Sequence, residues 1–299
     1  MRIIWFAFFA PVLMSQTVPA VGWVSTGQHL RRLVGLPGST RAESPMASFD
    51  NIRIAPGGQL ALVEDRAGAA LMSLTDDGPV PLVRLDSIPD AAAFAEDGSA
   101  LALLFGTRLE VRSCVLGRVD RLWSAEAEEV SELTVASGGS MAAIRVTGGA
   151  IRLVTDAGIG PVLYQGMQLG PLRFRGSTAL IFSDRTTGQL ISIESITARP
   201  STRVLRNQPA DDYAVSTDGR RVFLLVRGDA GTTISVLDLE VGQIVQDFAA
   251  GVEAARLHRL AARDLFLLAE PTDSEPGWML NGNEGQLTFL PALKIKEEN

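Results

Sequence analysis

The chain has 299 residues, more than one ordinary core of about 150 residues, so it forms either two domains or one large repetitive or barrel-like domain. Hydrophobic residues make up 46% of the chain and charged residues 20%, which excludes intrinsic disorder. The 27 basic and 34 acidic residues give a formal charge of −7, and this argues against nucleic acid as a partner, because binding a phosphate backbone depends on Lys and Arg.

The N-terminal segment has the features of a secretory signal peptide. Arg2 precedes an apolar run over residues 3–14, and small and polar residues then lead to Val18-Pro19-Ala20. This pattern predicts a signal peptide over residues 1–20, cleaved near Ala20 or Ser15. A retained membrane anchor is the alternative, although the run is shorter than the roughly 20 residues that span a bilayer. We therefore expect a periplasmic or secreted protein without a stable membrane span after cleavage.

Short apolar segments interrupted by Gly-Gly, Asp-Gly or a single Gly recur through the rest of the chain. Each segment is typical of two strands joined by a tight turn, because these turns accept positive φ angles. The first turn glycines are Gly58, Gly98, Gly139, Gly176 and Gly219, which lie 40, 41, 37 and 43 residues apart. A second glycine opens an alternating strand in each unit, at Gly68, Gly106, Gly149, Gly188, Gly231 and Gly285.

Six units of about 40 residues without helical periodicity predict an all-β protein, a β-propeller, in which each small sheet packs against its neighbours. A β-sandwich would not explain the even period. The pattern leaves the last unit one strand short after Leu290, and residues 27–34 align with residues 242–249, the fourth strand of unit five. We therefore expect six four-stranded blades, closed by pairing of the N- and C-terminal strands. The propeller domain would span residues 21–293, followed by a tail at 294–299.

The fifth unit has Ser216-Thr217-Asp218-Gly219 in its first turn and Asp238 at the end of its third strand. This unit resembles the repeat of bacterial YVTN-type and TolB-like propellers, which places Ser-Pro-Asp-Gly and Asp at these points. Thr replaces the usual Pro, and the turns of units four and six lack Asp-Gly. The resemblance extends over residues 48–291. It implies a propeller fold and an extracytoplasmic setting, and it fixes no activity.

Recognisable catalytic motifs are missing from the sequence. The two histidines, His29 and His258, have no spacing typical of a metal pair or of a Ser-His-acid arrangement. Nucleophile-elbow, Walker and dinucleotide-binding motifs do not occur. We interpret His258 as a hydrogen-bonded structural residue. Cys114 is the only cysteine, so an intramolecular disulfide is impossible, and we expect Cys114 to be a small buried hydrophobic residue.

The segments between units are rich in acids and almost free of basic residues. In a propeller, these segments and the loops between second and third strands open on the same face. The acids are Asp50, Asp86, Asp90, Glu126, Glu128, Glu129, Asp211, Asp212 and Glu253. They predict an acidic face that attracts a cation, a basic peptide or a cationic glycan. Alternatively, these acids reflect the preference of turns for Asp and the solubility of an exported protein.

The sixth unit departs from the period, since 54 residues separate Gly231 from Gly285. We place the surplus, residues 271–284, in a loop between strands two and three on the acidic face. Long loops on rigid scaffolds are common binding elements, and Trp278 and Met279 in this loop are predicted to form an apolar anchor. The alternative is that Trp278 packs against the closing blade.

These patterns predict an exported, non-enzymatic propeller that binds a protein or peptide. The predicted binding residues are Asp50, Asp90, Glu128, Asp211, Asp212, Glu253, Trp278 and Met279. The alternative is a propeller enzyme, a lactonase-like or glycan-directed hydrolase or lyase, that uses carboxylates at the channel mouth. A structural or envelope-assembly module is a third hypothesis. The sequence assigns no cofactor; three or more carboxylates converging on one point would favour Ca²⁺.

Overall fold

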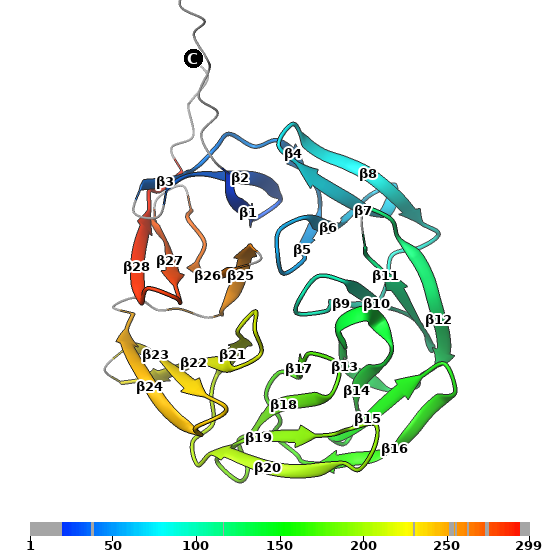
Figure 1. Ribbon diagram of the computed structural model, residues 1–299. Coiled ribbons are helices and arrows are strands. Elements are labelled where there is room, and N and C mark those ends of the chain that lie inside the picture. The colour runs from blue at the N-terminus through cyan, green and yellow to red at the C-terminus, as the bar shows by residue number, and fades with distance from the viewer. Residues whose placement is uncertain are drawn as a thin grey trace, which may run out of the picture.

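In the computed structural model, seven small antiparallel sheets are arranged around one axis, with the first strand of each sheet nearest the axis (Figure 1). The structure describes residues 20–36, 39–115, 117–229, 231–250, 254, 256–261, 263–272 and 275–293. The predicted β-propeller is confirmed. No helix in these residues is long and apolar enough to cross a membrane. The predicted signal peptide and C-terminal tail lie almost wholly outside the described residues, so both remain predictions.

The first four blades follow one another in chain order. They contain β1 (Ala20–Thr26), β2 (His29–Leu36), β3 (Ser39–Ala42) and β4 (Ala47–Ser48); β5 (Asn51–Ile54), β6 (Leu60–Asp65), β7 (Gly68–Thr75) and β8 (Gly78–Leu85); β9 (Ala91–Phe94), β10 (Ala100–Phe105), β11 (Arg108–Ser113) and β12 (Asp120–Glu126); and β13 (Val130–Val135), β14 (Ala142–Val146), β15 (Ala150–Thr155) and β16 (Gly158–Gln165). A short 3-10 turn, η1 (Ser137–Gly139), joins β13 to β14.

The remaining three blades have the same strand order. They contain β17 (Arg173–Arg175), β18 (Ala179–Asp184), β19 (Gln189–Glu194) and β20 (Ser201–Arg206); β21 (Asp212–Val215), β22 (Arg221–Gly228), β23 (Gly231–Asp238) and β24 (Gln243–Ala249); and β25 (His258–Ala261), β26 (Arg263–Ala269), β27 (Gly277–Asn281) and β28 (Gln286–Leu290). Second strands such as β10 and β18 are apolar almost throughout because both of their sheet faces are buried, whereas outer strands such as β12 are mostly exposed.

The prediction of six blades is wrong, because residues 20–48 form a blade of their own. β1 and β2 form a hairpin in which Thr26 faces His29, and both β3 and β4 pair with the other edge of β2. The segment 27–34, expected to be the outer strand of the last blade, is instead the hairpin turn and most of the middle strand of the first blade. The last blade needs no added strand, since β27 is its third strand and β28 its fourth.

Side-chain packing, and not strand pairing, closes the ring within the described residues. β28 pairs only with β27 and lies beside β3 of the first blade (Figure 1). The first and seventh blades share one apolar cluster, made of Val24, Leu33, Leu260, Leu267, Met279 and Leu290. The first turn of the second blade also reaches the seventh, because a Cβ atom at Gly58 would lie 2.5 Å from the carbonyl oxygen of Leu260.

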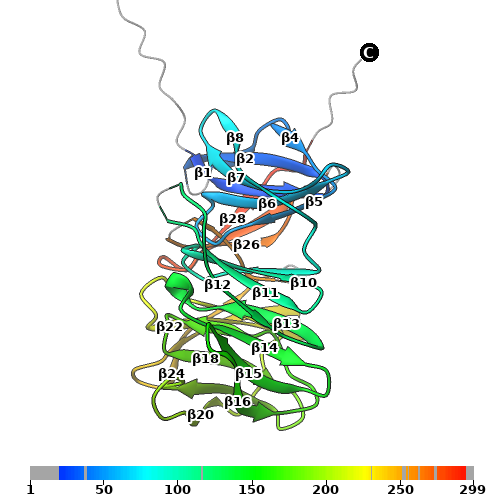
Figure 2. The same cartoon turned by 90° about the vertical axis from the view of Figure 1, so that its right-hand side faces the viewer.

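The strand directions define two faces of the ring, which Figure 2 shows from its side. In the second to seventh blades, the innermost strand begins at the face that carries the segments between blades, here called the interblade face. It ends at the opposite face, here called the turn face, which carries the turns between strands one and two and between strands three and four. β1 runs the other way, because the hairpin turn after Thr26 lies beside β4, next to the start of β5 at Asn51.

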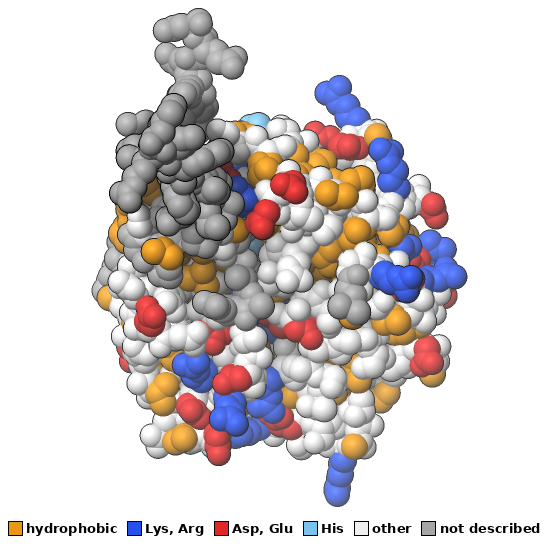
Figure 3. Space-filling model, turned by 45° about the horizontal axis from the view of Figure 1, so that its top comes forward, with side chains coloured by type: hydrophobic (Ala, Val, Ile, Leu, Met, Phe, Trp, Pro, Cys, Tyr) orange, Lys and Arg blue, Asp and Glu red, His pale blue; other side chains and the backbone are white. Residues whose placement is uncertain are grey.

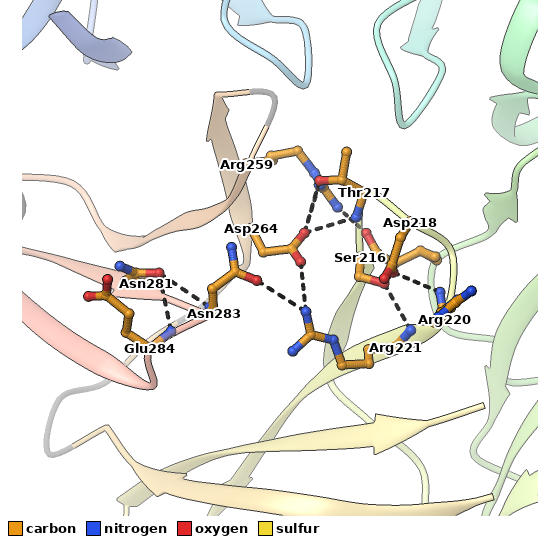
Figure 4. A network of polar contacts seen from close by, with 11 residues as sticks. Ser216, Thr217, Asp218, Arg220, Arg221, Arg259, Asp264, Asn281, Asn283 and Glu284 are labelled. Carbon is orange, nitrogen blue, oxygen red and sulfur yellow. Dashed lines mark hydrogen bonds and ion pairs between the residues drawn. The ribbon is translucent and has the colours of Figure 1, made fainter. Parts of the chain in front are cut away.

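A polar network joins the sixth and seventh blades near the turn face (Figure 4). Thr217, which replaces the Pro of the family repeat, donates from its backbone nitrogen and its hydroxyl to Asp264 Oδ1, at 2.9 and 3.0 Å. Arg259 donates to the Thr217 hydroxyl at 2.7 Å and to the carbonyl oxygen of Val215. Arg221 approaches Asp264 Oδ2 to 3.5 Å. The first turn of the sixth blade is therefore fixed by the second strand of the seventh.

Candidate binding face and central channel

The structure places the predicted acids on the interblade face, as the strand order requires. Asp50, Asp90 and Glu128 are exposed and lie just before the first strands of the second, third and fourth blades. Asp90 Oδ2 accepts a hydrogen bond from the backbone nitrogen of Gly106 at 2.6 Å, so this carboxylate also holds a turn. Glu253 lies outside the described residues. Whether these acids bind a partner stays a prediction.

Two arginines, Arg227 at the end of the second strand β22 and Arg185 in the turn after the second strand β18, offset part of this negative charge. Asp211 Oδ1 accepts a hydrogen bond from Arg185 at 3.2 Å, and its Oδ2 accepts one from the backbone nitrogen of Arg227 at 2.8 Å. The Arg227 guanidinium lies 3.9 Å from the same Oδ2. On the side shown in Figure 3, acidic and basic side chains are likewise interspersed. These arginines lie outside the interblade segments, so the prediction from those segments did not include them.

Asp212 is not on the exposed rim, although Asp211 precedes it directly. Its side chain is 7% exposed, and Oδ2 accepts a hydrogen bond from the backbone nitrogen of Leu257 at 2.8 Å. Its Oδ1 lies 3.7 Å from the Arg173 guanidinium. Asp212 therefore joins the sixth blade to the seventh and faces the central channel, which leaves little of it for a partner to contact.

Arg173 is the centre of a charged cluster in the channel. Its Nε lies 3.4 Å from Glu96 Oε1, so the cluster joins the third, fifth and sixth blades. The Arg173 and Glu96 side chains are 36% and 21% exposed, which means that water reaches the middle of the ring. Burial raises the pKa of the Glu96 carboxyl, and the nearby Arg173 opposes this shift. Sequence reasoning missed this cluster because its residues come from blades far apart in the chain.

Two further titratable groups adjoin the cluster. Glu132 Oε1 accepts a hydrogen bond from the backbone nitrogen of Leu172 at 2.8 Å, and Oε2 lies 2.8 Å from Arg145. Burial raises the pKa of Glu132. At His258, burial together with the positive charges of Arg173 and Arg256 lowers the pKa to about 4. Among the described residues, no three His, Cys, Asp or Glu side chains are grouped so as to hold a metal ion.

The predicted loop position of Trp278 and Met279 is wrong, because both lie on β27. Gly285 lies in the turn between the third and fourth strands, so the surplus segment 271–284 contains the third strand, β27, and the start of the turn that follows it. Met279 is 1% exposed and packs between the first and seventh blades. Trp278 is half-buried at the boundary between the sixth and seventh blades and packs edge-on against Phe289, with centroids 5.7 Å apart. This agrees with the alternative in which Trp278 packs within the closing blade.

A groove of about 490 Å³ opens on the interblade face between the fourth and fifth blades. Glu132 and Arg145 line it from the fourth blade, and Arg185 and Asp211 line it from the fifth blade and the segment that follows it. Its wall is the segment 168–171 that joins these two blades. Two hydrogen bonds fix this wall. Arg145 Nη1 donates to the Leu169 carbonyl oxygen at 2.6 Å, and the backbone nitrogen of Arg185 donates to the Gln168 carbonyl oxygen at 2.9 Å.

The described residues thus define a seven-bladed β-propeller with a charged channel and a groove on one face. No family model matches the chain, and no curated protein matches it. Among solved structures it is similar to TolB from Acinetobacter baumannii, with a TM-score of 0.51, 12% identity and 77% of this chain covered. The chain spans 65% of that TolB chain. The predicted resemblance to TolB-like propellers is therefore confirmed for the fold.

A second solved structure, Sqt1 from Saccharomyces cerevisiae, matches with a TM-score of 0.48 and 10% identity. The match covers 88% of this chain and 79% of the Sqt1 chain.

Proposed function

We propose that this protein is an exported, non-enzymatic propeller that binds a protein or peptide partner on its interblade face. The observation that carries this proposal is the groove between the fourth and fifth blades, lined by charged side chains on hydrogen-bonded segments. Binding residues commonly lie on loops that a rigid scaffold positions, and a propeller ring is such a scaffold. Asp50 and Glu128 are exposed on the same face outside the groove, so their carboxylates offer the partner further contacts.

The channel carboxylates support binding in preference to the enzyme alternative. Glu96 and Asp212 both lie close to Arg173, and Glu132 lies beside Arg145. A general acid or base must contact its substrate, and these carboxylates instead contact arginines and backbone nitrogens of the ring itself. We therefore assign these groups to the cohesion of the ring.

The test is site-specific photo-crosslinking in the cells that produce the protein. A photoreactive amino acid replaces Glu128 or Gln168 on the interblade face, and Asp97 or Val241 on the turn face as matched controls. All four residues are exposed. We expect a crosslinked protein partner from the interblade positions alone. Crosslinks from the turn face alone, or from neither face, would contradict the proposal.

Export needs its own measurement. The N-terminal sequence of the protein purified from the periplasm or medium should begin after Ala20 or near Ser15. Recovery in the cytoplasm with Met1 and the apolar run 3–14 intact would contradict export.

A further inference from the structure

We propose that the groove between the fourth and fifth blades binds an acidic side chain, Asp or Glu, within an extended segment of the partner. This rests on the proposed function and names the chemistry that the groove selects. The interblade face as a whole was expected to attract cations. The groove differs, because its lining balances Glu132 and Asp211 with Arg145 and Arg185. The Arg227 guanidinium, 3.9 Å from Asp211 Oδ2, adds a third positive charge beside the groove.

Arg185 is the side chain that can change partner. It is 48% exposed, and its only described ion pair is the one with Asp211. If Arg185 turns to a ligand, Asp211 keeps the hydrogen bond from the Arg227 nitrogen at 2.8 Å and the Arg227 guanidinium at 3.9 Å. No carboxylate is then left without a partner. Since a guanidinium presents parallel donors to a carboxylate, Arg185 can bind an acidic side chain through two hydrogen bonds.

Arg145 has a different role, because its contacts fix it. Its Nη1 donates to the carbonyl oxygens of Leu169 and Gly170, at 2.6 and 3.3 Å, and its Nη2 lies 2.8 Å from Glu132. Its side chain is 23% exposed. Arg145 therefore holds the wall of the groove with its charge paired to Glu132, and Arg185 contributes the mobile contact.

An apolar contact adjoins this charge. Met167 directly precedes the wall segment and is 80% exposed, the most exposed of the large hydrophobic residues described. Leu169, two residues on, lines the groove. Methionine side chains adapt to varied apolar partners. An apolar residue next to the partner's acidic residue would cover Met167 and exclude water from the new ion pair.

The remaining face restricts the partner's charge. Exposed acids such as Asp50, Asp86 and Glu128 lie on the same face, and the whole chain carries a formal charge of −7. A polyanion would be repelled by these charges. The groove therefore selects a single acidic residue in an otherwise neutral or basic segment.

The test uses random peptides displayed within a loop of a carrier protein, so that no peptide has a free carboxyl terminus. We expect selection on the full propeller to enrich Asp or Glu next to a large apolar residue. Arg185→Gln should weaken binding of the selected peptides about 10- to 100-fold, because it removes a charge-assisted contact. Met167→Ala should weaken it about tenfold. Arg220→Gln makes the same charge change in an exposed arginine of the turn face and should leave binding unchanged.

A methionine-methyl NMR spectrum locates the bound peptide. The Met167 signal should shift on binding, whereas the signal of Met141, which is 6% exposed, should stay in place. A selection that yields no binders, or binders without acidic residues, would overturn the proposal. Binding unaffected by Arg185→Gln in a variant that melts like the wild type would do the same.

The two proposals can fail separately. If Glu128 crosslinks a cellular partner but no acidic peptide binds the groove, the assigned chemistry is wrong and the binding function stands. If acidic peptides bind the groove but no partner is crosslinked in cells, the groove chemistry stands and the binding function is wrong.

Discussion

Arg259 and Asp264 form a buried ion pair at the boundary between the sixth and seventh blades. Arg259 Nη1 lies 3.2 Å from Asp264 Oδ1, and the two side chains are 4% and 5% exposed. The guanidinium also lies over the ring of Phe266, with its carbon 5.3 Å from the ring centroid. Asp264 accepts two further hydrogen bonds from Thr217 (Figure 4). One carboxylate therefore compensates a buried charge and fixes a turn of the neighbouring blade.

Asp264→Ala should lower the free energy of unfolding by about 3–5 kcal/mol, because it leaves Arg259 buried without its counter-ion. Chemical denaturation followed by circular dichroism measures this change. The control is Asp86→Asn, which alters an exposed acid and should stay within about 0.5 kcal/mol of the wild type. Equal stability of both variants would mean that the pair contributes nothing to holding the blades together.

Trp23 tests whether residues 20–48 form the first blade. Its side chain is 4% exposed and packs in a cluster shared by the first and second blades, which includes Leu30 and Met72. Trp23→Ala should lower the free energy of unfolding by about 3–5 kcal/mol through lost burial and a cavity. Leu36→Ala in the same blade removes a side chain that is 63% exposed and should have little effect. An unchanged melting temperature for Trp23→Ala would contradict the packing of residues 20–48 as a blade.

Replacing Gly98 or Gly106 by alanine distinguishes the cost of a positive φ angle from the cost of a clash with the neighbouring blade. Both have positive φ angles, +71° at Gly98 and +61° at Gly106. A Cβ atom at Gly98 would lie 2.7 Å from the Pro56 carbonyl oxygen in the second blade, whereas at Gly106 it would meet nothing within 4 Å. Gly106→Ala should cost about 1 kcal/mol for the backbone conformation alone. Gly98→Ala should cost clearly more, and similar losses on thermal melting would refute the close approach of the two blades.

Turn chemistry predicted where most strands end, but not how many blades form. Gly58, Gly98 and Gly219 do lie in first turns with positive φ, as their neighbours in the sequence indicate. The first turn of the first blade also has positive φ, at Gly27, but its sequence lacks the Gly-Gly or Asp-Gly pair found at Gly58, Gly98 and Gly219. Whether such a short segment forms a blade depends on the strand it pairs with and on the neighbours that bury it. Neither is a local property of the sequence.

The candidate site was predictable only in part, for a related reason. The order of strands placed Asp90 and Asp211 on the interblade face, and the structure agrees. Their partners come from other loops, as Arg185 does for Asp211. The contact between Arg173 and Glu96 joins blades that are not neighbours in the chain. The pattern placed Gly285 at the start of the third strand, whereas it lies in the turn between the third and fourth strands. Because of this difference, β27 was predicted to be a loop.

Cys114 should resist thiol reagents in the native protein. It is 9% exposed, as the sequence led us to expect, and burial raises the pKa of its thiol to about 11. The thiolate is the reactive form, and it is scarce near pH 8 when the pKa is this high. Labelling with a maleimide at pH 8 should therefore be slow in buffer and fast in denaturant. Rapid labelling of the native protein would show that the site opens readily.

His258 gives the fold a sensitivity to acid with a defined sign. Its pKa is about 4 in the native state, lowered by burial and by Arg173 and Arg256, and about 6.5 in the unfolded chain. Between these values the unfolded state binds the proton and the native state does not, so stability falls as the pH falls from 6.5 to 4.

His258→Gln should remove this contribution, which reaches about 3 kcal/mol at pH 4. Glu96 and Glu132 have the opposite effect on stability. Their raised pKa values let the native state bind protons more readily than the unfolded state, so they stabilise the fold as the pH falls. Both proteins contain these carboxyls, so their effect cancels when the variant is compared with the wild type. The measurement is the free energy of unfolding of both proteins by urea denaturation between pH 4 and 8. The difference in free energy of unfolding between the wild type and His258→Gln should change with pH only below about 6.5, where the wild type loses more stability. A difference that stays constant from pH 8 to 4 would mean that His258 titrates normally and is exposed to solvent in the native state.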